Sequence, residues 1–247
     1  MTFPQTNNDY SKEEYWNSRY KEEDEFDWFS TYETLKLFLN DSIAKHDSIL
    51  MLGCGNSTLS AEMYRDGYHN ITNVDYSGVV IENMEEKYED MTEMTWKVLD
   101  IRNLDALHQD FDVVLEKGTL DALLVNEKDP WFMSTEAETM LHQVLLQITR
   151  HLKTGGRFIS ITFVQPHFRK PLYARTEYDW SIRTFKFEKV FEYFYYVMTK
   201  GEVLSEADAR LRDEYKQQLD QQPVRSCSPD SENEDYLFMI SLSDEDD

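Results

Sequence analysis

Two glycines and one acid at fixed spacing carry the clearest chemistry in this chain. The apolar run 49–52 leads into Gly53 and Gly55, which have one residue between them. Asp75 follows Gly53 by 22 residues and ends a second apolar run. A strand, a glycine turn, a helix and a strand ending in a carboxylate build a nucleoside site at the edge of a Rossmann-like sheet. The glycines let the backbone approach a ligand, and Asp75 can accept hydrogen bonds from both ribose hydroxyls.

The glycine turn lacks the parts that hold a phosphate. Dinucleotide sites have a third glycine where this chain has Thr58, and they place a pyrophosphate at the following helix N-terminus. No basic residue lies between Gly53 and Glu62. These features favour a nucleoside without phosphates, of which S-adenosylmethionine is the common one, and they disfavour a nicotinamide cofactor. Gly-x-Gly alone is weak evidence, because many tight turns contain it.

Two further apolar segments end in polar residues. The segment 95–99 leads into Asp100 and Ile101. We expect Asp100 to accept a hydrogen bond from an adenine amino group and Ile101 to offer the ring an apolar surface. A helix N-cap is an equally good interpretation of Asp100. The segment 111–116 predicts a fourth strand, which leads into Lys117.

These segments together resemble a known family, the seven-strand S-adenosylmethionine-dependent methyltransferases. More narrowly, they resemble the branch that methylates lysines of translation elongation factor 1-alpha. The narrow resemblance rests on residues 14–20 (EYWNSRY), 27–29 (DWF), 52–57 (LGCGNS) and 116–123 (EKGTLDAL), of which the last is the most specific. Met51 and Ser57 depart from the general methyltransferase pattern, which often has an acid and a third glycine there. Both departures also occur in the narrow branch.

The resemblance implies two sets of functional residues. The cofactor contacts that it implies are Trp16, Tyr20, Trp28, Gly53, Asp75, Tyr76, Asp100, Ile101 and Lys117. The catalytic segment that it implies is Glu116, Lys117, Gly118, Thr119, Leu120 and Asp121. Lys117 is unusual beside a cationic cofactor, so we expect its stem to pack by the adenine and its charge to reach a carboxylate such as Asp100.

Several of these residues have a purely structural alternative. Trp16 and Tyr20 share one side of a predicted helix, which would form either a lid over the cofactor or a helix docked on the core. Asp121 would either orient the substrate lysine and take its proton or cap a helix. The other candidates for the substrate side are Glu116, Trp131, Tyr178, Asp179 and Trp180, and acceptor identity is expected to reside in loops near 125–135 and 165–182.

The remaining pattern alternates helices and strands. Predicted helices span 31–42, 57–66, 78–89 and 136–152, and predicted strands span 48–53, 71–75, 95–99, 111–116 and 157–163. A terminal antiparallel pair is expected at 182–187 and 191–198. The expected fold is therefore α/β, a Rossmann-like seven-stranded sheet of parallel strands plus a C-terminal antiparallel hairpin, with helices on both faces.

Three parts of the chain are expected. Residues 1–30 form an N-terminal aromatic lid segment, residues 31–200 the methyltransferase domain, and residues 201–247 an acidic, partly disordered tail. Within this tail, 202–222 is expected to form an exposed charged helix, 223–234 to be disordered, and 236–242 to be a short apolar patch.

Composition limits the classes of partner. The net charge is −23; residues 202–247 hold 14 acids and 4 bases, a net −10, so residues 1–201 carry −13. An acidic field disfavours nucleic acid and attracts a basic protein, although acidity also serves solubility. The two cysteines, Cys54 and Cys227, are poor disulfide partners. No signal peptide, membrane span or metal-ligand spacing is visible, so a reduced, cytoplasmic location is expected.

The leading hypothesis is a monomeric protein-lysine N-methyltransferase that uses S-adenosyl-L-methionine and methylates translation elongation factor 1-alpha. It has no metal, nucleic acid or membrane as a partner. Two alternatives stay open. One is a methyltransferase with a different protein or a small molecule as acceptor, and the other is a methyltransferase-like scaffold without catalysis.

Overall fold

Short apolar runs form the strands of one seven-stranded sheet in the computed structural model, which describes residues 4–127, 129, 131–188 and 191–221. The strand order is β3-β2-β1-β4-β5-β7-β6. The strands are β1 (Ile49–Leu52), β2 (Ile71–Asp75), β3 (Thr95–Val98), β4 (Phe111–Lys117), β5 (Leu152–Thr162), β6 (Trp180–Glu188) and β7 (Glu192–Lys200). The first five pair in parallel, and β7 pairs antiparallel with both β5 and β6. The predicted fold class is therefore confirmed.

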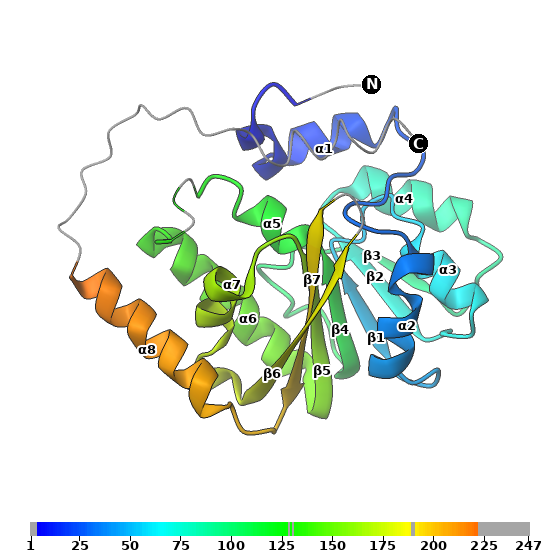
Figure 1. Ribbon diagram of the computed structural model, residues 1–247. Helices are drawn as coiled ribbons and strands as arrows, with labels where there is room; N and C mark the ends of the chain where they lie inside the picture. The colour runs from blue at the N-terminus through cyan, green and yellow to red at the C-terminus, as the bar shows by residue number, and fades with distance from the viewer. Residues whose placement is uncertain (1–3, 128, 130, 189–190, 222–247) are drawn as a thin grey trace.

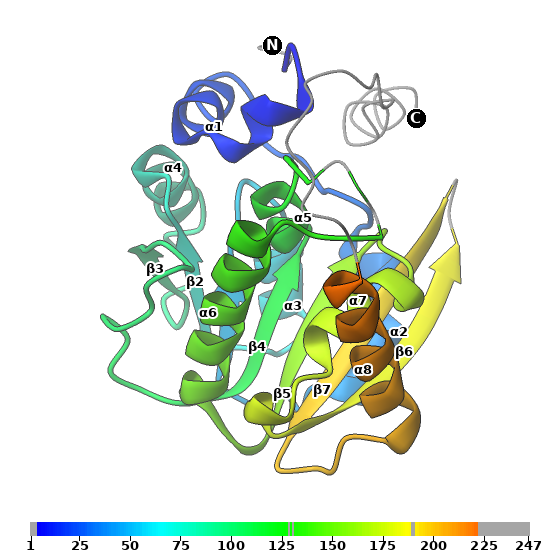
Figure 2. The same cartoon turned by 90° about the vertical axis from the view of Figure 1, so that its left-hand side faces the viewer.

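Helices cover both faces of this sheet (Figure 1). The helical elements are η1 (Asn7–Ser11), α1 (Glu13–Arg19), α2 (Tyr32–Ser42), α3 (Leu59–Arg65), α4 (Gly78–Lys87), α5 (Thr119–Leu123), α6 (Thr135–His151), α7 (Pro166–Tyr173), η2 (Thr176–Tyr178) and α8 (Glu206–Asp220). Helices α2, α3 and α4 lie on one face, and α5, α6, α7 and α8 lie on the other, as the rotated view in Figure 2 also shows.

The alternating side chains of the strands divide the core into two layers. On β1, Ile49 and Met51 pack into the layer beneath α2, α3 and α4, whereas Leu50 and Leu52 pack into the layer beneath α5 and α6. All four side chains are buried. A strand covered on both faces reads as a continuous apolar run, which is why this segment shows no polar alternation.

Most predicted elements are confirmed to within a few residues, but two differ. Residues 166–173, expected to be a loop, form α7, with Pro166 at its first turn where the missing N–H costs nothing. The strand expected from 157 begins at Leu152, directly after α6, with a register shift in its pairing to β4. The glycine pair 155–156 therefore lies inside β5 rather than before it.

The expected exposed charged helix differs in its packing. Helix α8 lies beside α7, with Asp208, Arg212 and Tyr215 buried. Lys170 of α7 forms a 2.7 Å ion pair with Asp208. The helix therefore has a docked face that its charged composition does not reveal. The expectations for 223–234 and 236–242 lie outside the described residues.

The N-terminal residues cross the carboxyl edge of the parallel strands. Helix α1 lies above this edge in Figure 1, close to α4 and α5. Because parallel strands all end at the same edge, the residues that follow β1, β2, β3 and β4 come together beneath α1. This arrangement positions the candidate site.

Candidate active site

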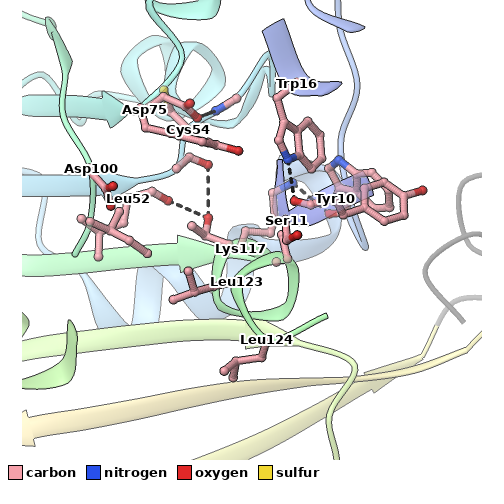
Figure 3. A pocket seen from close by; sticks show the side chains of 18 of the residues that line it. Tyr10, Ser11, Trp16, Leu52, Cys54, Asp75, Asp100, Lys117, Leu123 and Leu124 are labelled. Carbon is pink, nitrogen blue, oxygen red and sulfur yellow. Dashed lines mark hydrogen bonds between the residues drawn. The ribbon is translucent and has the colours of Figure 1, made fainter. Parts of the chain in front are cut away.

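A cavity of about 420 Å³ opens at this edge between the strand ends and the N-terminal segment. All nine predicted cofactor contacts line it: Trp16, Tyr20, Trp28, Gly53, Asp75, Tyr76, Asp100, Ile101 and Lys117. Figure 3 shows Asp75 and Asp100 on one side of the cavity, and Tyr10, Ser11 and Trp16 on the other. Its volume falls within the ~300–1,000 Å³ range of small-molecule sites. The structure therefore brings together residues that the chain separates by as many as 101 positions, from Trp16 to Lys117.

Only glycine fits at position 53, because the backbone conformation and the neighbouring side chain leave no room for a Cβ. The φ of Gly53 is +57°, in the left-handed region, and a Cβ there would lie 2.4 Å from the Thr119 side chain. Thr119 Oγ1 instead donates a 2.9 Å hydrogen bond to the Leu52 carbonyl. The end of β1 and the start of α5 are thus in direct contact. This close packing leaves the backbone at the turn open to a ligand.

Asp75 is held in place by backbone N–H groups. Gly55 N–H donates to Oδ2 at 3.0 Å, and Ser77 N–H donates to Oδ1 at 2.9 Å. Burial raises the pKa of Asp75 to about 6, against the lowering effect of these hydrogen bonds. A carboxylate has about four acceptor positions, so these two bonds leave room for hydroxyl donors in the cavity. The carboxylate is buried at the cavity wall, as a ribose-binding acid requires.

Asp100 does not cap a helix, because 101–110 contains only turns. Its carboxylate instead accepts the backbone N–H of Arg102 at 2.8 Å and pairs with the Arg102 guanidinium. The N-cap interpretation of Asp100 is therefore wrong. Ile101 is buried beside it and lines the same cavity. An adenine contact for this pair stays a prediction.

Aromatic side chains close the cavity on the N-terminal side. The rings of Trp16 and Tyr20 stack at 5.6 Å, and Trp28 packs edge-on against Trp16. The Trp16 indole N–H donates to the Tyr10 carbonyl at 2.8 Å, which ties α1 to η1. The two interpretations of this segment are compatible, since the aromatic side chains pack on the core and also line the cavity.

Lys117 has a partner that sequence reasoning missed. Its ammonium lies 3.2 Å from Asp27 Oδ1 and donates to the Trp28 carbonyl at 2.9 Å. Asp100 is occupied by Arg102. The expected contact between Lys117 and Asp100 is therefore wrong. Asp27 belongs to the motif 27–29. That motif did not reveal the contact, because the contact depends on the N-terminal segment folding back onto β4.

The implied catalytic segment divides into two groups. Lys117, Gly118 and Thr119 line the cavity, whereas Glu116, Leu120 and Asp121 are buried away from it. Glu116 Oε2 accepts the backbone N–H groups of Thr119 and Leu120, at 3.0 and 3.1 Å. Glu116 Oε1 accepts a short hydrogen bond from the Ser160 hydroxyl. Glu116 thus holds the first turn of α5, which carries Thr119 to the cavity.

Asp121 pairs with a cation from α7. Arg169 Nη2 and the Thr162 hydroxyl each lie 2.6 Å from Asp121 Oδ1. Burial raises the pKa of Asp121 and that of the neighbouring Glu116, and the charge of Asp121 raises the pKa of Glu116 further. The guanidinium of Arg169 opposes this rise. The direct proton-transfer role expected for Asp121 stays a prediction, and its side chain does not line the cavity.

The candidates for the substrate side lie at opposite edges of the sheet. Trp131 stands in the loop between Glu127 and Ser134, which both line the cavity, and it is 60% exposed. Trp180, in contrast, begins β6 opposite Lys200, at the amino edge of the parallel strands. It stacks on Phe158 in the core and does not reach the cavity.

Tyr178 and Asp179 precede Trp180 directly, so they lie at this same amino edge. Tyr178 is buried in the core layer beneath α6, and its hydroxyl is hydrogen-bonded to the His142 ring at 2.8 Å. Neither residue lines the cavity. The placement of Tyr178, Asp179 and Trp180 on the substrate side is therefore wrong. The cause is the direction of β6: β5 and β6 both pair antiparallel with β7, so β6 runs in the same direction as β5 and begins at the amino edge.

Several lining residues were not predicted. Tyr10 and Ser11 of η1, Phe29, and Asn126 after α5 all line the cavity. Asn126 donates to the Ser11 hydroxyl at 3.3 Å, which joins η1 to the loop after α5. Two signals were available for this group: Tyr10 lies six residues before Trp16 in the same aromatic segment, and Phe29 ends the motif 27–29.

The described part of the chain shows no group of three or more His, Cys, Asp or Glu side chains that could hold a metal ion. Within the same residues, no helix combines the length and apolar character needed to cross a bilayer.

Four acids and two bases line the cavity; the acids are Asp75, Asp100, Glu127 and Glu136, and the bases are Arg102 and Lys117. The lining is therefore suited to a cationic ligand.

Known proteins are similar to this chain in sequence or in fold. The family described as a methyltransferase domain matches residues 43–228. The chain is 41% identical over 246 residues to EEF1A lysine methyltransferase 4 of Mus musculus, covering 97% of this chain and 95% of that protein. The Bos taurus protein of the same name is 39% identical over 243 residues, with the same coverage. N-methyltransferase NodS of Bradyrhizobium japonicum, solved with S-adenosyl-l-homocysteine, shares the fold, with a TM-score of 0.59 at 12% identity over 79% of this chain and all of that one.

Proposed function

The chain belongs to the S-adenosylmethionine-dependent methyltransferases, within the branch of the EEF1A lysine methyltransferases, and from that premise we propose its reaction. The enzyme transfers methyl groups from S-adenosylmethionine to a lysine side chain of translation elongation factor 1-alpha. The convergence of nine predicted cofactor contacts on one cavity carries the proposal. The nearly full-length relatives supply the identity of the substrate.

The residues present fit this cofactor. The turn at Gly53 gives an exposed backbone that a Cβ would block, and Asp75 gives a buried carboxylate for ribose hydroxyls. Asp100 and Ile101 supply an acceptor and an apolar surface for an adenine. Trp16, Tyr20 and Trp28 present aromatic faces, which attract cations.

When bound, the cofactor supplies a methyl group on a sulfonium, which a neutral amine can take by in-line displacement without acid assistance to the leaving thioether. The protein therefore needs to align the amine and keep water out. The aromatic segment carrying Tyr10, Trp16 and Trp28 covers the strand ends and serves that purpose.

A lysine amine must lose its proton before it can act as a nucleophile, because its ordinary pKa is ~10.4. Burial in an aromatic-lined cavity disfavours the ammonium form and so lowers this pKa. Glu127 and Glu136, near the start of α6, are the acids available to attract the incoming ammonium. Asp121 and Glu116 act from beneath the cavity, through α5.

We also propose that the enzyme is cytoplasmic, because translation elongation takes place in the cytoplasm. The proposal further includes that it works as a monomer. Nucleic acid is a poor partner for a chain with a net charge of −23.

Mass spectrometry of purified elongation factor 1-alpha, incubated with the enzyme and S-adenosylmethionine, tests the proposal. A methylated lysine is expected with the wild type and not with Asp75→Ala. If S-adenosylhomocysteine binds the enzyme in calorimetry but no lysine is methylated, the acceptor is wrong. If S-adenosylhomocysteine does not bind, the chain is a scaffold. Transfer that survives Asp75→Ala would contradict the site.

A further inference from the structure

Asp27 joins three parts of the cavity wall. Its carboxylate accepts a short hydrogen bond from the Ser57 hydroxyl and a 2.8 Å hydrogen bond from the Thr58 hydroxyl. The same carboxylate receives the Lys117 ammonium, with Nζ 3.2 Å from Oδ1. A single acid of the N-terminal segment therefore contacts both the glycine turn and the end of β4.

The pair that Asp27 forms with Lys117 is largely withdrawn from solvent. The Lys117 side chain is 5% exposed and that of Asp27 is 12% exposed. Burial alone would raise the pKa of Asp27, but the charge of Lys117 and the hydroxyls of Ser57 and Thr58 outweigh it and lower the pKa. Asp27 thus remains ionised and balances the ammonium beside it.

Charge compensation of this kind recurs around the cavity. Arg102 is the other base in the lining, and its guanidinium lies 2.5 Å from the carboxylate of Asp100. Each lining base therefore has its own acid. Without Asp27, Lys117 would be an unpaired cation in a wall where water screens charge poorly.

We propose that Asp27 is a positioning residue that neutralises Lys117 and thereby lets the cavity prefer the sulfonium cofactor to its thioether product. The inference rests on the cofactor of the proposed function. S-adenosylmethionine and S-adenosylhomocysteine share the adenosine and amino-acid parts, but the sulfonium form carries one more positive charge. The ratio of their affinities therefore measures the electrostatic potential around the sulfur.

The same contacts also fit a simpler mechanical role. Phe29 follows Asp27 by two residues and has a φ of +68°, a strained conformation for a residue other than glycine. A Cβ on Gly118 would lie only 2.9 Å from the Phe29 ring. Asp27 could thus serve only to fasten the N-terminal segment to β4. A fastening role predicts equal losses of both ligands, whereas charge compensation predicts unequal losses.

Calorimetry with both ligands on the full chain separates the two roles. In Asp27→Asn, we expect the preference for S-adenosylmethionine over S-adenosylhomocysteine to fall about tenfold, as an unpaired nearby cation would cause. Lys117→Met removes the cation and should shift the preference the opposite way. The double variant Asp27→Asn/Lys117→Met should return the ratio to the wild-type value.

Asp112→Asn is the matched control. Asp112 lies at the other end of β4 and pairs with Lys153 at 2.7 Å, so this change also frees a lysine, but far from the cavity. Its affinity ratio should equal that of the wild type. If Asp27→Asn does not fold, Lys117→Met decides: a ratio shifted toward S-adenosylmethionine supports the inference, and an unchanged ratio overturns it.

Two outcomes would overturn charge compensation directly. In the first, Asp27→Asn weakens both ligands equally. In the second, the double variant keeps the altered ratio of Asp27→Asn, so that the effect does not pass through Lys117. A wild-type chain that binds neither ligand would instead refute the cofactor of the proposed function, and this inference with it.

Discussion

Asp121 and Arg169 form a 2.6 Å ion pair whose side chains are only 1% and 3% exposed. The pair joins α5 to α7 beneath the cavity. Asp121 Oδ2 and Arg169 Nε have no hydrogen-bond partner among the described residues. Each charge therefore depends on the other, and Asp121 supports α5 from beneath the cavity without lining it.

Breaking this pair should cost stability, and replacing it entirely should not. Asp121→Leu leaves a buried guanidinium without its partner and should lower the free energy of unfolding by about 3–5 kcal/mol. Asp121→Leu/Arg169→Met should recover most of that loss. Urea denaturation followed by circular dichroism measures both. A double variant that regains stability but shows no measurable kcat would instead place Asp121 in the reaction.

Asp75 should make cofactor affinity depend on pH. Burial raises its folded-state pKa to about 6, above the ~3.9 of an unfolded chain. The stability that its protonation contributes is thus present below about pH 4 and lost as the pH rises through 6. Ribose hydroxyls need the ionised form, so affinity should be about tenfold weaker at pH 5 than at pH 7.

Calorimetry with S-adenosylhomocysteine across that range measures the effect. Asp75→Asn should bind weakly and with no step near pH 6. Glu13, whose charge also raises the pKa of Asp75, is the neighbouring acid to exclude. A wild-type step that persists unchanged in Asp75→Asn would assign the titration to another group.

Glu116 should act through α5. Glu116→Ala leaves the buried N–H of Leu120 and that of Thr119 without an acceptor, at a cost of about 1–3 kcal/mol each. Cofactor affinity should fall as well, because Thr119 lines the cavity. Glu116→Gln keeps an acceptor oxygen and should lose much less of both. Thermal unfolding and calorimetry on the two variants test this.

The opposite pattern would indicate a chemical role for this acid. If Glu116→Gln kept its stability and cofactor affinity but lost kcat, proton transfer by Glu116 would be supported instead of capping.

Trp131 should contact the protein substrate. It is exposed in the loop that borders the cavity, and its ring packs against Phe168 of α7 at 4.9 Å. Trp131→Ala should raise the KM for elongation factor 1-alpha about tenfold, as loss of a strong aromatic anchor does. The affinity for S-adenosylhomocysteine should not change. Val203→Ala, at an exposed apolar residue far along the chain, is the control that should leave KM unchanged.

The sequence alone determined the sheet and the edge of it at which the cavity lies. Apolar runs predict the strands. The glycine turn follows the first run and Asp75 ends the second, so the order of residues along the chain was enough to predict that the two lie close together. Parallel strands end at one edge by geometry. The same local reasoning correctly predicted α2 and α6, whose apolar residues recur with helical spacing.

Only the tertiary structure decided the partners of the charged side chains. Lys117 pairs with Asp27 from 90 residues earlier, and Asp121 pairs with Arg169 from 48 residues later. It also decided that Trp180 stands at the edge away from the cavity. An ion pair between distant segments depends on how these segments fold together. The spacing of residues along the sequence does not show how close they come in space. Strand ends are fixed by the local chain, whereas pairings across layers are fixed only by packing.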